Sequence, residues 1–130
     1  MHTLLSRFLR VSMALLCLAA LPGCVALIAG GSAVGGTLYA TGDLKSTIDE
    51  TPRRTRDAIV EAADTLELVR ISGESDALTG RYVFRTGDDR RITIRYQSIG
   101  ERLTEVSIRV GTFGDEDLSL QILRAIRSEL

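Results

Sequence analysis

The sequence predicts an α+β domain over residues 37–130, in which a mostly antiparallel sheet carries two helices packed on one of its faces. Two patterns predict this fold. Apolar and polar residues alternate along several stretches between residues 38 and 110, as they do in strands with one buried and one solvated face. Two further stretches, which follow Thr51 and Asp115, place apolar residues at helical spacing behind a capping residue.

The start of the chain predicts export. Arg7 and Arg10 precede an uncharged run rich in Leu and Ala, and a small residue, Gly23, stands before Cys24. A basic start, an apolar stretch of this length and a small residue at the cleavage point are typical of a secretory signal peptide. We therefore predict a lipoprotein signal peptide over residues 1–23 and a mature chain that begins at Cys24.

The residues around this cleavage point resemble a bacterial lipobox, in which cysteine receives a diacylglyceryl group and, after cleavage, an acyl chain such as palmitate. Leu21, Gly23 and Cys24 fit the pattern, and Pro22 departs from it. The chemistry requires cysteine because a thiolate is nucleophilic enough to take the lipid as a thioether. Several acyl chains, each contributing about 0.8 kcal/mol per buried CH₂, make a lasting anchor. The alternative is an uncleaved membrane helix, which the Pro22-Gly23 break disfavours.

Residues 24–36 combine the predicted lipidation site with a run of Gly and Ala, which predicts a tether that lies against the membrane surface. Gly31 and Gly35 also match the spacing of dimerising membrane helices, but the segment is shorter than a bilayer span. Val25 stands where enteric-type sorting uses aspartate for inner-membrane retention. We therefore expect a lipid-anchored envelope protein on the periplasmic face of the outer membrane.

The composition of the predicted mature chain excludes several kinds of chemistry. His2 and Cys17 leave with the signal peptide, so neither histidine nor any thiol other than Cys24 remains. Disulfides, His/Cys metal sites and imidazole catalysis are thereby excluded, and we expect no cofactor and no metal. Without Arg7 and Arg10 the chain has 14 basic residues against 17 acidic ones, which argues against nucleic acid as a partner.

The domain is expected to begin with a strand over residues 38–48 that bends at Gly42, because the alternation continues on both sides of the glycine. Thr51 has the side chain of an N-cap, and Pro52 suits the first helical position. A helix should therefore begin there and end near Thr65.

Four more strands and a helix are expected in the rest of the chain. A strand over residues 66–71 is followed by a meander of three strands over residues 77–86, 90–98 and 103–110, with glycine in both hairpin turns. Asp115 then caps a helix whose apolar stripe continues to the C-terminus. The strand order is left open by these local patterns.

The alternation also assigns residues to the two faces of the sheet. The apolar face and the helix stripes predict the core, with Leu78 beside it: Tyr82, Phe84, Ile92, Ile94, Val106 and Ile108 from the sheet, and Ile59, Ala62, Ile122 and Ile126 from the helices. The other face should be solvated and includes Val83 and Thr93. It also carries a candidate ligand or partner face of arginines: Arg81, Arg85, Arg91, Arg95 and Arg109. Guanidinium groups match carboxylates and phosphates, but ordinary ion pairs with neighbouring acids are the alternative.

Several segments together are similar to one known family: Gly42-Asp43-Leu44-Lys45, Asp76-Ala77-Leu78-Thr79-Gly80 and, most specifically, Val110-Gly111-Thr112-Phe113-Gly114-Asp115-Glu116. With the lipobox and the Gly/Ala segment, they resemble a family of short bacterial lipoproteins that is catalogued only as a domain of unknown function. The resemblance covers nearly the whole mature chain. It implies a membrane-anchored envelope protein and assigns no catalytic or binding residue.

Carboxylates are the main groups left for catalysis, and their positions do not favour it. Asp115, Glu116 and Asp117 suit the first turn of a helix better than a cation site. Asp88 and Asp89 fall in a predicted exposed turn, where nothing would separate their pKa values. We assign no catalytic residue and no metal ligand.

The sequence thus predicts a non-enzymatic envelope lipoprotein, which holds a small domain at the membrane for interaction with a partner or for envelope maintenance. The expected partners are the membrane, through the lipid on Cys24, and an envelope protein or an anionic envelope polymer. Two alternatives stay open. One is a binder of anionic envelope ligands through the arginine face. The other is a carboxylate-dependent hydrolase of an envelope polymer, which would need a concave pocket that gathers acids from distant segments.

Overall fold

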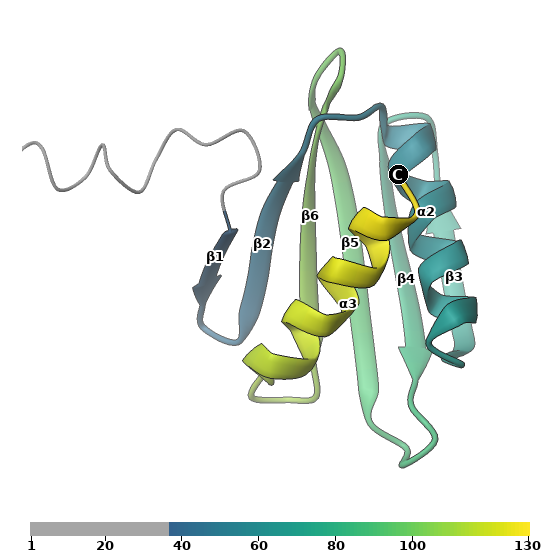
Figure 1. Ribbon diagram of the computed structural model, residues 1–130, viewed down its shortest axis with the longest axis vertical. Coiled ribbons are helices and arrows are strands. Elements are labelled where there is room, and N and C mark those ends of the chain that lie inside the picture. Colours follow the sequence, from purple (N-terminus) through teal and green to yellow (C-terminus); the bar gives the residue numbers. More distant parts are fainter. Residues whose placement is uncertain (1–36) are drawn as a thin grey trace, which may run out of the picture. The chain divides into compact units, whose positions relative to one another are not determined.

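The structure, a computed structural model, describes residues 37–130, which lie within one compact unit. These residues form a six-stranded antiparallel sheet with two helices over one face (Figure 1). The predicted fold class is therefore confirmed. The predicted signal peptide, Cys24 and the tether lie outside the described residues.

The chain passes once from one edge of the sheet to the opposite edge and then returns through consecutive hairpins. The elements are β1 (Thr37–Ala40), β2 (Asp43–Ile48), α2 (Pro52–Thr65), β3 (Val69–Ser75), β4 (Thr79–Arg85), β5 (Arg91–Gly100), β6 (Leu103–Val110) and α3 (Glu116–Ser128). The strand order is β1-β2-β6-β5-β4-β3, so α2 carries the chain from β2 to the opposite edge at β3. Strands β5 and β6 therefore occupy the middle of the sheet (Figure 1).

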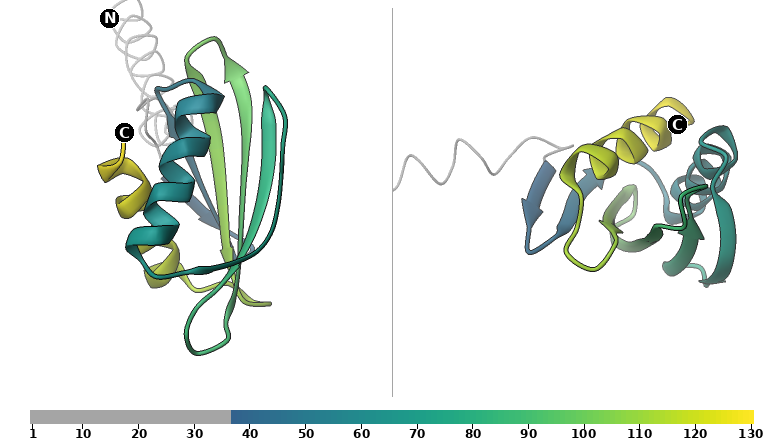
Figure 2. Two further views of the ribbon diagram at one scale, coloured as in Figure 1. Left: turned by 90° about the vertical axis from the view of Figure 1, so that its right-hand side faces the viewer. Right: turned by 90° about the horizontal axis from the view of Figure 1, so that it is seen from below.

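Both helices begin at the predicted caps. The Thr51 hydroxyl accepts a hydrogen bond from the backbone N–H of Arg54 at 3.3 Å, and the Asp115 carboxylate accepts one from the N–H of Leu118 at 3.0 Å. The helices lie on the same side of the sheet (Figure 2). Neither of these two described helices is long and apolar enough to cross a membrane.

The core lies between the helices and the sheet, and all ten residues predicted for it are buried. Ile94 of the central strand β5 is 1% exposed and lies opposite Ile108 of β6. Leu78, which we expected on the apolar face, is 60% exposed instead, because it lies in the turn before β4. Period-2 alternation thus extends beyond the end of the strand in the sequence, but the burial of its apolar residues does not.

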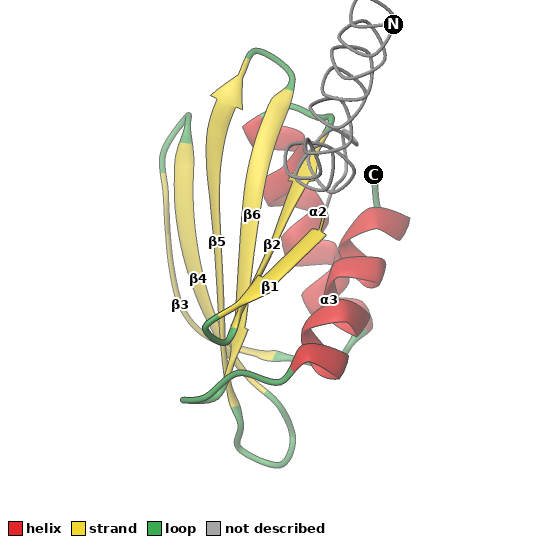
Figure 3. Cartoon of the chain, turned by 90° about the vertical axis from the view of Figure 1, so that its left-hand side faces the viewer, coloured by secondary structure: helices red, strands yellow, loops and turns green. Residues whose placement is uncertain are grey.

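The single strand expected over residues 38–48 is wrong, because the chain reverses there. Thr41 and Gly42 have φ values of 52° and 84°, and two consecutive residues of this kind make the tight turn of a two-residue hairpin. Strand β1 consequently pairs with β2 at the outer edge of the sheet (Figure 3). Leu38 lies opposite Lys45 on the solvated face and is 62% exposed.

The strand expected over residues 66–71 is shifted along the chain. Leu66 forms the C-cap of α2, and both Leu66 and Leu68 pack against the core from the connection that follows the helix. Strand β3 is Val69–Ser75 and is exposed along its whole length. It forms the edge of the sheet next to β4, with a bulge between Arg70 and Ser72. The two leucines suggested a strand because their spacing is also that of alternation.

Candidate functional site

The face of the sheet opposite the helices carries a groove with a volume of about 650 Å³, which we call the polar groove. It crosses the sheet from β2 to the connection between β3 and β4. The residues that line it are Asp43, Lys45, Glu74, Ser75, Asp76, Thr79, Gly80, Arg81, Arg95, Tyr96, Gln97, Glu105 and Ser107. Most of them come from the polar alternation, so the face predicted to be solvated is also the concave one.

One line of residues runs across the floor of the polar groove, and we call it the central row. The register places Lys45 opposite Ser107, Ser107 opposite Arg95, Arg95 opposite Arg81 and Arg81 opposite Glu74. Neighbouring strands lie about 4.8 Å apart, so the row spans roughly 19 Å from Lys45 to Glu74. Its charges follow the order base, neutral, base, base and acid.

The central row contains a pair of like charges that form no ion pair among the described residues. Arg81 and Arg95 lie directly opposite each other on adjacent strands, an arrangement that destabilises a sheet. Among the described residues, the side chains of Arg81, Arg95 and Glu74 take part in no hydrogen bond and no ion pair. The paired base of the row is Lys45, whose Nζ lies 3.9 Å from Glu105 Oε1. The middle of the groove therefore has two guanidinium groups available for a ligand.

The other predicted arginines lie on the same face but differ in their partners. Arg85 forms an ion pair with Asp89 across the β4–β5 turn. Arg109 binds Asp43, as described below. Arg91 lies opposite Arg85, outside the residues that line the polar groove, and its side chain forms no ion pair within residues 37–130. The five arginines therefore do not act as one positive cluster.

Two residues of this face, Val83 and Thr93, are not solvated as we expected. They lie opposite each other and are only 4% and 9% exposed. Their neighbours on the face are Ser72, opposite Val83 on β3, and the five arginines, of which two lie on each side along β4 and β5 and one, Arg109, lies opposite Thr93 on β6. The aliphatic stems of arginine cover apolar surface while the charged ends remain in water. Covering this pair is thus a structural role for the arginine face.

Arg109 connects the β1–β2 turn to the β6–α3 turn through hydrogen bonds. Its Nε and Nη2 donate to the two carboxylate oxygens of Asp43 at 2.9 and 2.8 Å. Nη2 also donates to the carbonyl of Thr41 at 2.8 Å, and Nη1 to the carbonyl of Thr112 at 3.2 Å. The hydrogen bond from Arg109 holds the pKa of Asp43 below its usual range, and the charges of Arg95 and Lys45 act in the same direction.

The same two turns touch through glycines. A Cβ atom on Gly42 would lie 2.5 Å from the carbonyl oxygen of Phe113, and one on Gly114 would lie 2.4 Å from the Cα atom of Gly42. Gly42 and Gly114 have φ values of 84° and 87°, which L-residues rarely adopt. Two of the segments that carry the family resemblance, Gly42-Asp43 and Val110–Glu116, are therefore explained by the packing of one turn on another.

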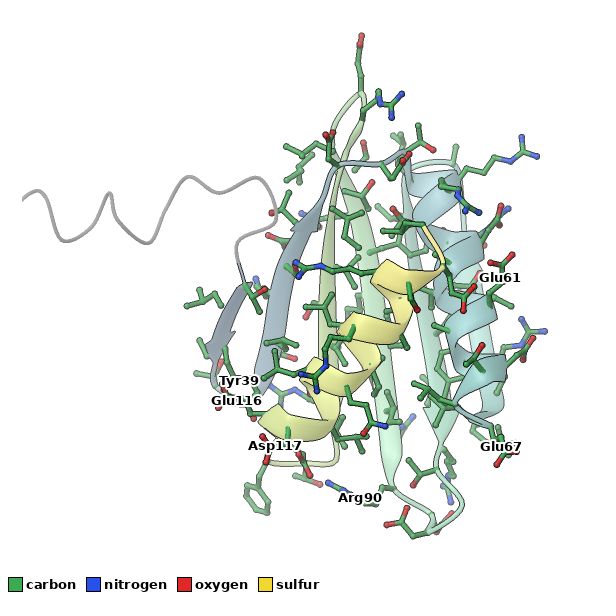
Figure 4. The ribbon with its side chains drawn as sticks, in the orientation of Figure 1. Tyr39, Glu61, Glu67, Arg90, Glu116 and Asp117 are labelled. Atoms are coloured by element: carbon green, nitrogen blue, oxygen red, sulfur yellow. The ribbon has the colours of Figure 1, made fainter. Side chains whose placement is uncertain are left out.

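Two further acids, Asp76 and Asp115, form hydrogen bonds or ion pairs with nearby groups. The N–H groups of Leu78 and Thr79 each donate to Asp76 Oδ1 at 2.8 Å, and these bonds lower the pKa of Asp76. Asp115 caps α3 and pairs with Arg90 of the β4–β5 connection at 2.6 Å. Figure 4 shows Glu116 and Asp117 at the start of α3, with Arg90 below them. Within the described part of the chain, no three His, Cys, Asp or Glu side chains form a group that could hold a metal ion.

The polar groove meets one requirement of the hydrolase alternative, and two of its four acids do not meet the other. It gathers acids from distant segments, namely Asp43, Glu74, Asp76 and Glu105. A carboxylate hydrolase also needs an acid whose pKa is raised, so that it can donate a proton near neutral pH. The pKa values of Asp43 and Asp76 are lowered instead. These two groups therefore stay ionised and serve structure.

The fold and the groove define a small α+β domain with helices on one face of its sheet and an open, polar groove on the other. The chain belongs to the family described as Protein of unknown function (DUF3568), whose family model matches residues 7–129. That match takes in both turns that Arg109 joins. Among curated proteins, none matches this chain.

Proposed function

We propose that the protein is a non-enzymatic, lipid-anchored envelope module that binds an anionic ligand in the polar groove. The observation that carries the proposal is the Arg81–Arg95 pair, two guanidinium groups on facing positions that form no hydrogen bond and no ion pair among the described residues. Guanidinium groups recognise carboxylates and phosphates through paired hydrogen bonds. A bound anion would also remove the repulsion between the two arginines.

The chain before the domain supports the membrane anchor. Residues 1–23 have the pattern of a lipoprotein signal peptide and Cys24 stands at its cleavage point. Thirteen residue steps separate Cys24 from Thr37, the first residue of β1. A chain of that length reaches at most about 45 Å when fully extended. The domain is therefore within reach of ligands at its own membrane and in the adjoining envelope.

A binding role, and not a catalytic one, is supported by the state of the groove acids. Asp43 is engaged by Arg109 and Asp76 by the backbone of the β3–β4 connection, so neither is available as a proton donor. Glu105 is engaged by Lys45, whose Nζ lies 3.9 Å from its Oε1. A ligand that enters the groove therefore meets fixed charges that hold it.

The proposal is tested by titration with inorganic phosphate as the probe. The described residues hold a complete core, so a lipid-free chain that begins at Val25 retains it, and we call this chain the lipid-free domain. Binding followed by NMR shift changes should weaken about tenfold in Arg81→Gln and in Arg95→Gln, the loss of one bond to a charged group. Arg91→Gln is the matched control, since Arg91 lies on the same face outside the groove.

The control also sets the outcome that would contradict the proposal. Equal weakening in all three variants would show that phosphate binding depends only on the net charge of the domain. Absence of binding by the parent domain would remove the anion site altogether.

A further inference from the structure

Glu74, the acid of the central row, has no role in the proposed anion site. Glu74 lies directly opposite Arg81 at the β3 end of the row and is exposed. Its carboxylate has no hydrogen bond and no ion pair within residues 37–130. The nearest base on its own strand, Arg70, lies opposite Phe84 on the helix side of the sheet, because the bulge after Arg70 reverses the alternation. The strand therefore provides no partner for Glu74.

We propose that the polar groove selects a zwitterion of the phosphoethanolamine type, with its phosphate on Arg81 and Arg95 and its primary ammonium on Glu74. This inference rests on the proposed function and names the class of ligand. The three residues lie in line on adjacent strands, at steps of about 4.8 Å. A ligand whose two charges are a few ångströms apart matches that spacing.

The donors of the site favour phosphate over carboxylate. Each guanidinium group offers five N–H donors, and two such groups converge from β4 and β5. A carboxylate has only two oxygens to accept them, whereas a phosphomonoester such as phosphoethanolamine presents three. The pair Arg81 and Arg95 is therefore better satisfied by a phosphate.

The remaining charges of the groove favour a zwitterion over a simple anion. The lining contains three basic residues, Lys45, Arg81 and Arg95, and also the four acids named above. A polyanion lying along the groove would meet these acids as repulsive neighbours. A ligand that carries its own ammonium group turns the carboxylate of Glu74 from a repulsive neighbour into a hydrogen-bond acceptor.

Glu74 is the acid placed to accept that ammonium. Asp76 lines the same end of the groove, but its two oxygens already accept hydrogen bonds from Leu78 and Thr79. At the β3 end of the groove, Glu74 is therefore the acid whose oxygens are available to a primary ammonium group.

The test compares phosphoethanolamine with inorganic phosphate on the lipid-free domain. The parent domain should bind phosphoethanolamine about tenfold more tightly than phosphate, the minimum expected from one bond to a charged group. Glu74→Gln should abolish that preference and leave phosphate affinity the same or higher. Glu61→Gln should change neither, because Glu61 lies on the outer side of α2 (Figure 4) and is the matched acid control.

Two vesicle arms distinguish the source of the ligand. If the source is a lipid headgroup, the domain should bind vesicles of phosphatidylethanolamine and not of phosphatidylcholine, whose quaternary nitrogen has no proton to donate. If the source is a free molecule, only soluble phosphoethanolamine should show the preference.

The outcomes separate this inference from the proposed function. Phosphate binding with no preference for phosphoethanolamine, or a preference that survives Glu74→Gln, overturns the zwitterion and keeps the anion site. Binding of neither compound overturns both.

Discussion

Replacing glycines one at a time tests whether the β1–β2 turn and the β6–α3 turn really touch. Gly42→Ala combines two penalties: the left-handed backbone at φ 84° and a Cβ atom 2.5 Å from the carbonyl oxygen of Phe113. Gly111→Ala carries the first penalty alone, since φ is 68° and nothing lies within 4 Å. Gly87→Ala carries neither, because its φ is not positive and its surroundings are open.

The expected losses of stability follow from these differences. An L-residue in the left-handed region costs about 1–2 kcal/mol, and the reduced freedom of the unfolded chain returns about 0.4–1 kcal/mol. Gly111→Ala should therefore lower the free energy of unfolding by about 1 kcal/mol, and Gly87→Ala should leave it unchanged or slightly raised. Overpacking adds about 1–3 kcal/mol, so Gly42→Ala should cost about 2–4 kcal/mol.

Urea denaturation of the lipid-free domain measures all three variants on one scale, provided that the slope of each transition is unchanged. Gly114→Ala extends the series, because its Cβ would lie 2.4 Å from the Cα atom of Gly42 and it should behave like Gly42→Ala. If Gly42→Ala cost no more than Gly111→Ala, the two turns would not be in contact. The packing explanation of the Val110–Glu116 segment would then be wrong.

Three further predictions concern the core, the pH dependence and the anchor. Ile94→Ala should cost about 2–5 kcal/mol in the free energy of unfolding, and Thr93→Ala clearly less; equal losses by urea denaturation would place the register one residue off. Since Arg109 lowers the pKa of Asp43, their pair stabilises the fold above the unfolded-state pKa of about 3.9, and this contribution is lost as the pH falls through the folded-state pKa. Asp43→Asn should therefore flatten the decline in stability measured between about pH 4 and 2, and an unchanged decline would contradict the role of the pair. The intact mass of the purified protein should correspond to a chain that begins at lipidated Cys24, and an unmodified Met1 terminus would rule out the anchor.

Local patterns were sufficient for the core and the helix caps. Ile94 and Ile108 alternate with polar neighbours, and each face of a strand has a period of two residues whatever its partner strand is. Thr51 and Asp115 cap helices through bonds that span three residues. The same local rule failed at Thr41-Gly42, where alternation on both sides of a tight turn imitates one continuous strand.

The polar groove depended on contacts that sequence patterns do not record. The sequence alone assigned most residues of the paired strands to the correct face, because side-chain polarity follows strand periodicity there, and it placed Arg81 and Arg95 on the same face; Val83 and Thr93 are exceptions, buried on the face that we expected to be solvated. The tertiary structure decided that α2 delivers β3 to the edge beside β4, that Glu74 therefore lies opposite Arg81, and that Arg109 is neutralised by Asp43, 66 residues away along the chain. The physical reason is that strand order and register are set by the packing of the whole sheet against both helices, whereas polarity is a property of each residue.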